Sequence, residues 1–153
     1  MRNFFLLISL ICLPIWAQNT AFVDPRIGSE GLGRVFIGPS CPYGMVKPSP
    51  DCTANNNSGW APMPEQVNGF GQIHVSGTGG GCKYGNVLIQ PFSGELNGTS
   101  HIDYREFEDI QLGFYRTKYK NSGILTEITT SDRASIYKFQ YKENANLLVD
   151  AGF

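Results

Sequence analysis

Charged residues are scarce in this sequence, and the two signs balance. Only 16% of the residues are charged, and 12 Lys and Arg stand against 13 Asp and Glu, whereas globular domains average about 25% charged residues. A nucleic-acid-binding protein would carry a clustered basic excess, so we expect no nucleic-acid partner. The sequence also lacks the run of about 20 apolar residues that a membrane-spanning helix needs, and we expect no membrane span.

Two further patterns are absent. No Cys-x-x-Cys pair is present, which leaves a structural zinc site poorly supported. No stretch of ten or more residues repeats its apolar positions with the helical period of 3.6, and the chain contains 18 Gly with many Asn, Ser and Thr. Because these residues favour turns over helix interiors, the composition argues against a helical bundle.

The N-terminal residues predict an export signal. Arg2 precedes an apolar run from Phe4 to Trp16, which is followed by the small residue Ala17. A short basic start, an apolar centre and a small residue at the end are typical of a signal peptide. We therefore expect residues 1–17 to be removed and residues 18–153 to act in a secreted or periplasmic location. An uncleaved anchor or a buried helix is the alternative.

Export bears on the cysteines that stay in the mature chain, namely Cys41, Cys52 and Cys82. An exported protein can hold a disulfide, but an odd number leaves one thiol unpaired. Buried thiols or a single disulfide are the simplest interpretation, and the pairing stays open. A catalytic pair of one of these cysteines with His74 or His101 is a less favoured alternative.

The remaining chain is predicted to be all-β, an antiparallel β-sandwich. Alternating apolar and polar residues separated by turn residues indicate strands, and such segments recur at 113–120, 124–130, 134–141 and 146–149. In the first, Phe114, Arg116 and Lys118 are expected on one face and Tyr115, Thr117 and Tyr119 on the other. Two further strands, at 67–76 and 86–90, are expected to flank the glycine cluster that begins at Gly77.

The acidic residues do not form a convincing catalytic pair. Hydrolysis of a glycoside with inversion needs an acid and a base about 6.5–9.5 Å apart. Only Glu106, Glu108 and Asp109 cluster, and we interpret that tract as a solvated connection rather than as an acid pair or a calcium site. Asp24 and Asp51 are expected to bond to nearby backbone in turns. We predict no catalytic residue and no metal ligand within this chain.

Several motifs follow one another in a specific order. These are Asp24-Pro25-x-Ile27-Gly28, then residues 33–40 (GRVFIGPS), then 42–51 (PYGMVKPSPD), then Gly69-Phe70-x-x-x-His74-Val75-Ser76-Gly77-Thr78-Gly79, and finally Gly85-Asn86-Val87-Leu88. In order and spacing they resemble the N-terminal domain of glycoside hydrolase family 92, the exo-acting α-mannosidases. The resemblance covers about residues 21–153.

The resemblance implies a two-domain enzyme. Family members pair an N-terminal β-sandwich with a larger C-terminal helical-barrel domain and hydrolyse terminal α-mannosides of glycans with inversion, using a calcium ion. The general acid, the base and most calcium ligands belong to the C-terminal domain, while loops of the N-terminal domain help to wall the sugar pocket. This chain ends at Phe153, directly after an apolar strand, so we expect a truncated domain without the catalytic domain.

The expected substrate contacts lie in the matched segments. Trp60, in a Gly- and Asn-rich loop, is expected to cover an apolar sugar face, with a core or interface position as the alternative. His74 and the turn Ser76-Gly77-Thr78-Gly79 are expected to bond to hydroxyls, although His74 could instead fasten the turn to neighbouring backbone. Arg34 and Phe36 complete the set. At the position of Arg34, many family members have His instead.

Three functions therefore stay open. The main hypothesis is the N-terminal, pocket-shaping module of a secreted, calcium-dependent exo-α-mannosidase. The alternative is a stand-alone carbohydrate-binding β-sandwich without catalytic activity. An exported structural domain without a ligand is the third.

Overall fold

The fold is that of a computed structural model, which describes residues 18–31, 33, 35–53, 58–76, 86–96, 98 and 101–153. The expected signal peptide, residues 1–17, lies outside the described residues. Within the described ranges, no helix has the length and apolar character needed to cross a bilayer.

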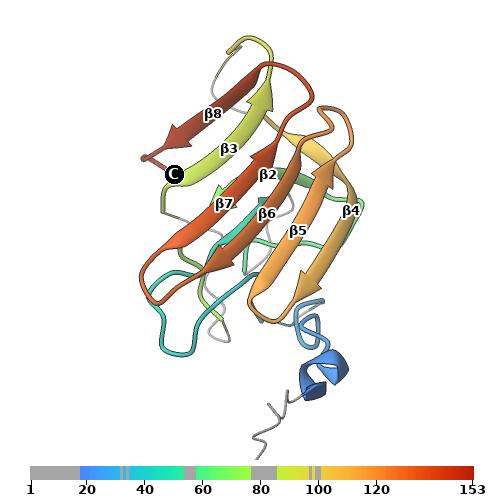
Figure 1. Cartoon of the computed structure of the whole chain (residues 1–153), viewed down its shortest axis with the longest axis vertical. Coiled ribbons are helices and arrows are strands. Elements are labelled where there is room, and N and C mark those ends of the chain that lie inside the picture. Colours follow the sequence, from blue (N-terminus) through green and yellow to red (C-terminus); the bar gives the residue numbers. More distant parts are fainter. Residues whose placement is uncertain are drawn as a thin grey trace, which may run out of the picture.

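The regular secondary structure of the described chain consists almost entirely of antiparallel strands (Figure 1). A short 3-10 helix, η1 (Gln18–Phe22), precedes them. The strands are β1 (Ser49–Cys52), β2 (Gln66–Gly71), β3 (Leu88–Ser93), β4 (Asp103–Gln111), β5 (Phe114–Tyr119), β6 (Leu125–Thr130), β7 (Ser135–Gln140) and β8 (Ala145–Asp150). Among the described residues they hydrogen-bond in the order β7-β6-β5-β4-β2-β3-β8, and β1 pairs with the other edge of β2.

This sheet curls into two facing layers, which confirms the predicted sandwich. Strands β4–β7 form one layer, and β1, β2, β3 and β8 belong to the other, with β4 pairing to both β5 and β2. Phe70 of β2 meets three rings of the facing layer, because its ring centroid lies 6.3 Å from that of Tyr115 and 6.2 Å from those of Tyr119 and Tyr137. Paired aromatic rings of this kind dominate core energetics.

The alternation expected in the C-terminal half is confirmed. Tyr115, Thr117 and Tyr119 are fully buried, whereas the other residues of β5 are only half-buried. On β7 half-buried and exposed residues alternate, and the half-buried Tyr137 and Phe139 pack against the core. Inward-facing aromatic side chains at every second residue therefore build the centre of the sandwich.

The N-terminal half differs from the expectation at several strands. The strand expected at 67–76 ends at Gly71, and beyond it the side chain of His74 bonds to the backbone of Lys47 and to Asp51. The strand expected at 86–90 runs instead from Leu88 to Ser93. Strands β1 and β4 were not expected, since β1 is short and contains proline and β4 is rich in charge.

Strand β4 corrects the interpretation of the acidic tract as a solvated connection. A β-bulge between Arg105 and Phe107 shifts the register against β5. Arg105 faces inward before the bulge, and Glu108 and Ile110 face inward after it, so the bulge reverses which residues point to the core. The Glu108 side chain is only 3% exposed, against 49% for Glu106.

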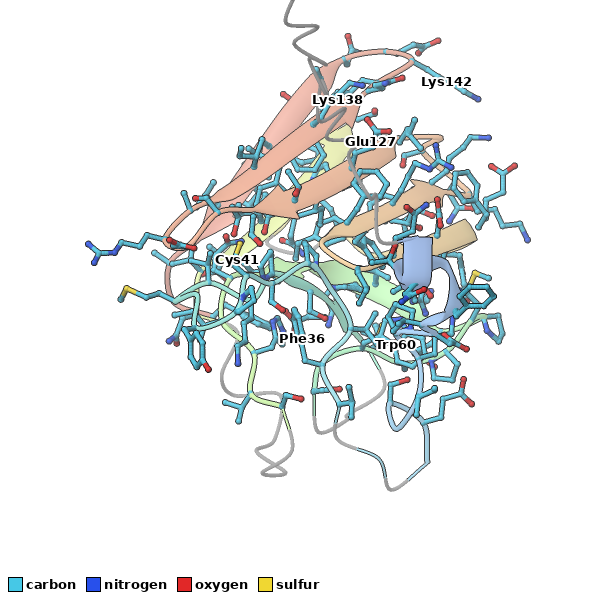
Figure 2. The ribbon with its side chains drawn as sticks, turned by 60° about the horizontal axis from the view of Figure 1, so that its bottom comes forward. Phe36, Cys41, Trp60, Glu127, Lys138 and Lys142 are labelled. Atoms are coloured by element: carbon cyan, nitrogen blue, oxygen red, sulfur yellow. The ribbon has the colours of Figure 1, made fainter. Side chains whose placement is uncertain are left out.

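The outer face of the β4–β7 layer carries a row of alternating charges. Asp109, Arg116, Glu127 and Lys138 stand opposite one another across the four strands. Arg116 lies 3.1 Å from Asp109, and Lys138 lies 2.8 Å from Glu127. In Figure 2, Glu127 and Lys138 lie on the strands, away from the loops around Phe36.

Candidate functional site

An open groove of about 670 Å³ lies beside the loops that contain the matched motifs. Four parts of the chain form it, namely described residues between Asp24 and Pro42, Lys47, Ser76, and the turn between β4 and β5 at Gln111–Gly113. This turn lies at the lower end of the molecule in Figure 1, near η1. The lining combines an aromatic ring, aliphatic side chains and hydroxyl, amide, carboxylate and ammonium groups.

Two of the predicted contact residues, Phe36 and Ser76, lie together in this groove. The Phe36 N–H donates to the Ser76 hydroxyl over 3.3 Å, which joins segments 40 residues apart. Phe36 is half-buried, so part of its ring remains accessible. Gly38, two residues later, has φ +154, and a Cβ there would lie 2.1 Å from the Pro48 carbonyl oxygen. Only glycine tolerates this combination of conformation and close approach.

His74 supports the groove from behind. Its side chain is buried, its Nδ1 lies 3.0 Å from the Lys47 carbonyl oxygen, and its Nε2 lies 3.0 Å from Asp51 Oδ1. Both ring nitrogens are therefore occupied by partners within the protein. The geometry fits the alternative in which His74 fastens the turn to neighbouring backbone.

Trp60 lies in the core rather than on the surface, which corrects its expected role as a sugar-stacking ring. It is 1% exposed, and its indole N–H donates to Glu108 Oε1 over 3.0 Å. The same oxygen accepts from Arg105 over 2.6 Å and from the Tyr115 hydroxyl. Burial raises the pKa of Tyr115 well above its usual range, so the phenol keeps its proton and remains a donor.

Arg34, Gly77, Thr78 and Gly79 lie outside the described residues. Their predicted contacts with substrate stay predictions.

The sequence analysis missed the groove wall formed by the β4–β5 turn. Leu112 is 53% exposed at its tip, and Gln111 and Leu112 also line a second hollow of about 500 Å³ shared with Thr20 and Val23. Gly113, at φ +75, makes the tight turn possible. The sequence feature that could have revealed this turn is Gly113, directly before β5. Because β4 was not predicted, the sequence analysis had no strand to pair with β5 in a hairpin.

Side chains that typically hold metal ions do not cluster among the described residues. Among them, no three or more His, Cys, Asp or Glu side chains gather closely enough to hold a metal ion. Cys41 and Cys52 are free thiols rather than a mutual disulfide, and Cys82 lies outside the described residues. Burial raises the pKa of Cys52 to about 11, which suits a thiol packed in the core and not a nucleophile.

Comparison with known proteins identifies the family. The sequence matches the profile described as "Glycosyl hydrolase family 92 N-terminal domain" over residues 22–153. The chain belongs to this family.

Relatives of this family 92 domain share its fold. The family GH92 α-mannosidase from Bacteroides thetaiotaomicron, solved in complex with mannoimidazole, is 26% identical, with a TM-score of 0.76 over 86% of this chain and 19% of that one. A GH92 glycosyl hydrolase named ccman5 shares the fold at 22% identity, with a TM-score of 0.75 over 88% of this chain and 20% of that one. A protein of Arthroderma benhamiae named "Uncharacterized secreted glycosidase" is 29% identical over 91% of this chain and 19% of its own length.

The chain thus spans about a fifth of the length of these relatives. It corresponds to the N-terminal part of larger family 92 glycosidases, which are hydrolases.

Proposed function

We propose that this chain is the N-terminal domain of an exported exo-α-mannosidase and that it forms one wall of the sugar pocket without supplying the acid or the base. The observation that carries the proposal is the groove in which Phe36 and Ser76 meet the β4–β5 turn. Ligand sites combine an apolar surface with a few convergent polar groups. A half-exposed ring beside a hydroxyl and an amide suits a neutral sugar, which has an apolar C–H face and several hydroxyls.

The chemistry of bond cleavage is assigned to the rest of the enzyme. Glu108 is buried and accepts three donors on one oxygen, and Asp51 is held by His74. Neither carboxyl is available to protonate a leaving group or activate water. The inverting mechanism and the calcium ion implied by the family are proposed for the complete enzyme.

Mannosidase activity is tested with the complete polypeptide that contains this domain. We expect it to release mannose from α-linked mannobiose, to lose activity with a calcium chelator and to regain it with added calcium. Proton NMR during early turnover should show β-mannose first, because inversion at an α-linkage yields the β-anomer. No mannose release under any condition would refute the proposal. Saturable glycan binding without release would support the non-catalytic carbohydrate-binding alternative instead.

Export is proposed on the N-terminal pattern and on the name of the fungal relative, a secreted glycosidase. N-terminal sequencing of the protein recovered outside the cytoplasm should begin at Gln18. A cytoplasmic protein that retains Met1 would contradict this assignment.

A further inference from the structure

A buried acid–base pair, Asp51 and His74, lies directly behind the groove. We propose that Asp51 is a positioning residue that, through His74, holds Phe36, Lys47 and Ser76 in the shape the sugar requires. The inference rests on the proposed function, and it assigns a role to a carboxylate for which the sequence suggested only a turn bond.

Asp51 uses both of its oxygens within the protein. Oδ1 lies 3.0 Å from His74 Nε2, and Oδ2 accepts the Gly71 N–H over 2.9 Å. The side chains of Asp51 and His74 are 2% and 3% exposed. One carboxylate on β1 therefore fixes the end of β2 and the histidine that follows it.

His74 connects Asp51 to the residues that line the groove. Its Nδ1 lies 3.0 Å from the carbonyl oxygen of Lys47, and its ring stacks near that of Phe36, with centroids 6.1 Å apart. Ser76, two residues further on, bonds to the Phe36 N–H. Phe36, Lys47 and Ser76 all line the groove, so each depends on the orientation of the one buried imidazole.

Gly59 packs closely against one side of the Asp51–His74 pair. A Cβ at this position would lie 2.6 Å from Asp51 Oδ1 and 2.8 Å from His74 Nε2. The backbone of residue 59 thus closes one side of the pair. Close packing on this side favours a single orientation of the ring, as a positioning role requires.

The hydrogen bonds define an informative isostere, Asp51→Asn. The Lys47 carbonyl can only accept, so His74 Nδ1 donates to it. With an amide at residue 51, Nε2 can accept from the amide N–H while the amide oxygen keeps the Gly71 N–H. Asp51→Asn therefore preserves the geometry without the charge, and Asp51→Ala removes the geometry.

Asp103 provides a matched control. It is a buried carboxylate, 6% exposed, which accepts the backbone N–H groups of Asn121 and Ser122 at 3.1 and 2.9 Å. It begins β4, whereas Gln111 in the groove ends that strand, about 26 Å away at ~3.3 Å per residue. Asp103→Ala therefore removes a comparable anchor whose partners, Tyr104, Asn121 and Ser122, do not line the groove.

The experiment compares these variants in the complete enzyme on α-linked mannobiose. We expect Asp51→Ala to raise KM at least about tenfold, Asp51→Asn to stay within about threefold of wild type, and Asp103→Ala to leave KM unchanged. An unchanged KM for Asp51→Ala, or an equal rise for Asp103→Ala, would overturn the positioning role. Wild-type enzyme that releases no mannose would instead overturn the proposed function.

A second variant and a second readout cover the case in which Asp51→Ala fails to fold. His74→Gln can keep a bond to Asp51 but removes the ring beside Phe36, and we expect KM to rise at least about fivefold. The 19F signal of 4-fluorophenylalanine at residue 36, assigned with Phe36→Leu, should shift in His74→Gln and not in Asp103→Ala. An unchanged signal in His74→Gln would contradict the proposal independently of activity.

Discussion

The indole N–H of Trp60 donates to the carboxylate of Glu108 over 3.0 Å, in the interior of the sandwich. This contact joins a tryptophan from a loop to the inward-facing carboxylate that follows the bulge in β4. Arg105 completes the arrangement by bonding to Glu108 and to the backbone oxygen of Ala61. The loop before β2 is thereby tied to β4 by a buried, charged network.

Removal of Glu108 should strongly destabilise the protein. Glu108→Gln leaves Arg105 buried without its counter-charge, and breaking a buried pair in this way costs about 3–5 kcal/mol. Urea unfolding measures the change. Glu106→Gln is the matched control, because Glu106 is half-exposed and pairs with Lys118 at the surface, where such a pair is worth about 0–1 kcal/mol. Equal effects of the two substitutions would contradict the buried network.

Trp60→Ala should act through stability rather than through substrate binding. A fully buried tryptophan replaced by alanine costs about 3–5 kcal/mol, and the indole donor to Glu108 is lost as well. We expect a lower thermal midpoint, and an unchanged KM at temperatures where the variant remains folded. A specific rise in KM with unchanged stability would restore Trp60 as a sugar contact.

Gly59→Ala and Gly94→Ala separate backbone strain from steric overlap. Both glycines have positive φ, +86 and +92, but a Cβ at residue 94 meets nothing within 4 Å. A non-glycine residue in such a conformation costs about 1–3 kcal/mol, which both variants share. Gly59→Ala should lose more, because its Cβ overlaps Asp51 and His74. Equal unfolding midpoints for the two variants would show that Asp51 and His74 can move to accommodate the added Cβ at residue 59.

Alkaline pH should destabilise the fold. Burial raises the pKa of Cys52 from 9.0 to about 11 and raises the pKa of Tyr119 and Tyr137 as well. Between pH 9 and 11 the unfolded chain therefore binds fewer protons than the folded chain, and stability falls as pH rises. The thermal midpoint should decrease from pH 8.5 to 10.5, less steeply in Cys52→Ala. A constant midpoint over this range would contradict the burial of these groups.

The C-terminal half of the fold could be predicted from the sequence, whereas the charged strand could not. On β5 and β7 the inward-facing residues include Tyr115, Tyr119, Tyr137 and Phe139, and most residues between them are Arg, Lys or Gln, so the pattern indicates the buried face. On β4 the bulge interrupts the alternation, so Glu108 looks like an exposed neighbour of Glu106. A single inserted residue is invisible to a pattern of period two.

The sequence predicted only those residues of the candidate site that lie in the matched motifs. Phe36 and Ser76 were identified from ordered motifs, and they do line one groove. The positions of Trp60 and Leu112 depend on tertiary pairing. Trp60 in a polar loop has no local feature that reveals its partner Glu108, 48 residues away, and Leu112 reaches the groove only because β4 and β5 form a hairpin.

The central claim is that the groove around Phe36 receives the terminal sugar of the substrate. The most direct test measures kcat and KM of Phe36→Ala on α-linked mannobiose in the complete enzyme, beside Phe114→Ala, which removes a half-buried ring from a shallow hollow bordered by Ile136 and Lys138 of β7. We predict that kcat/KM falls at least about tenfold for Phe36→Ala and less than about threefold for Phe114→Ala. Equal kcat/KM values for the two folded variants would contradict the account.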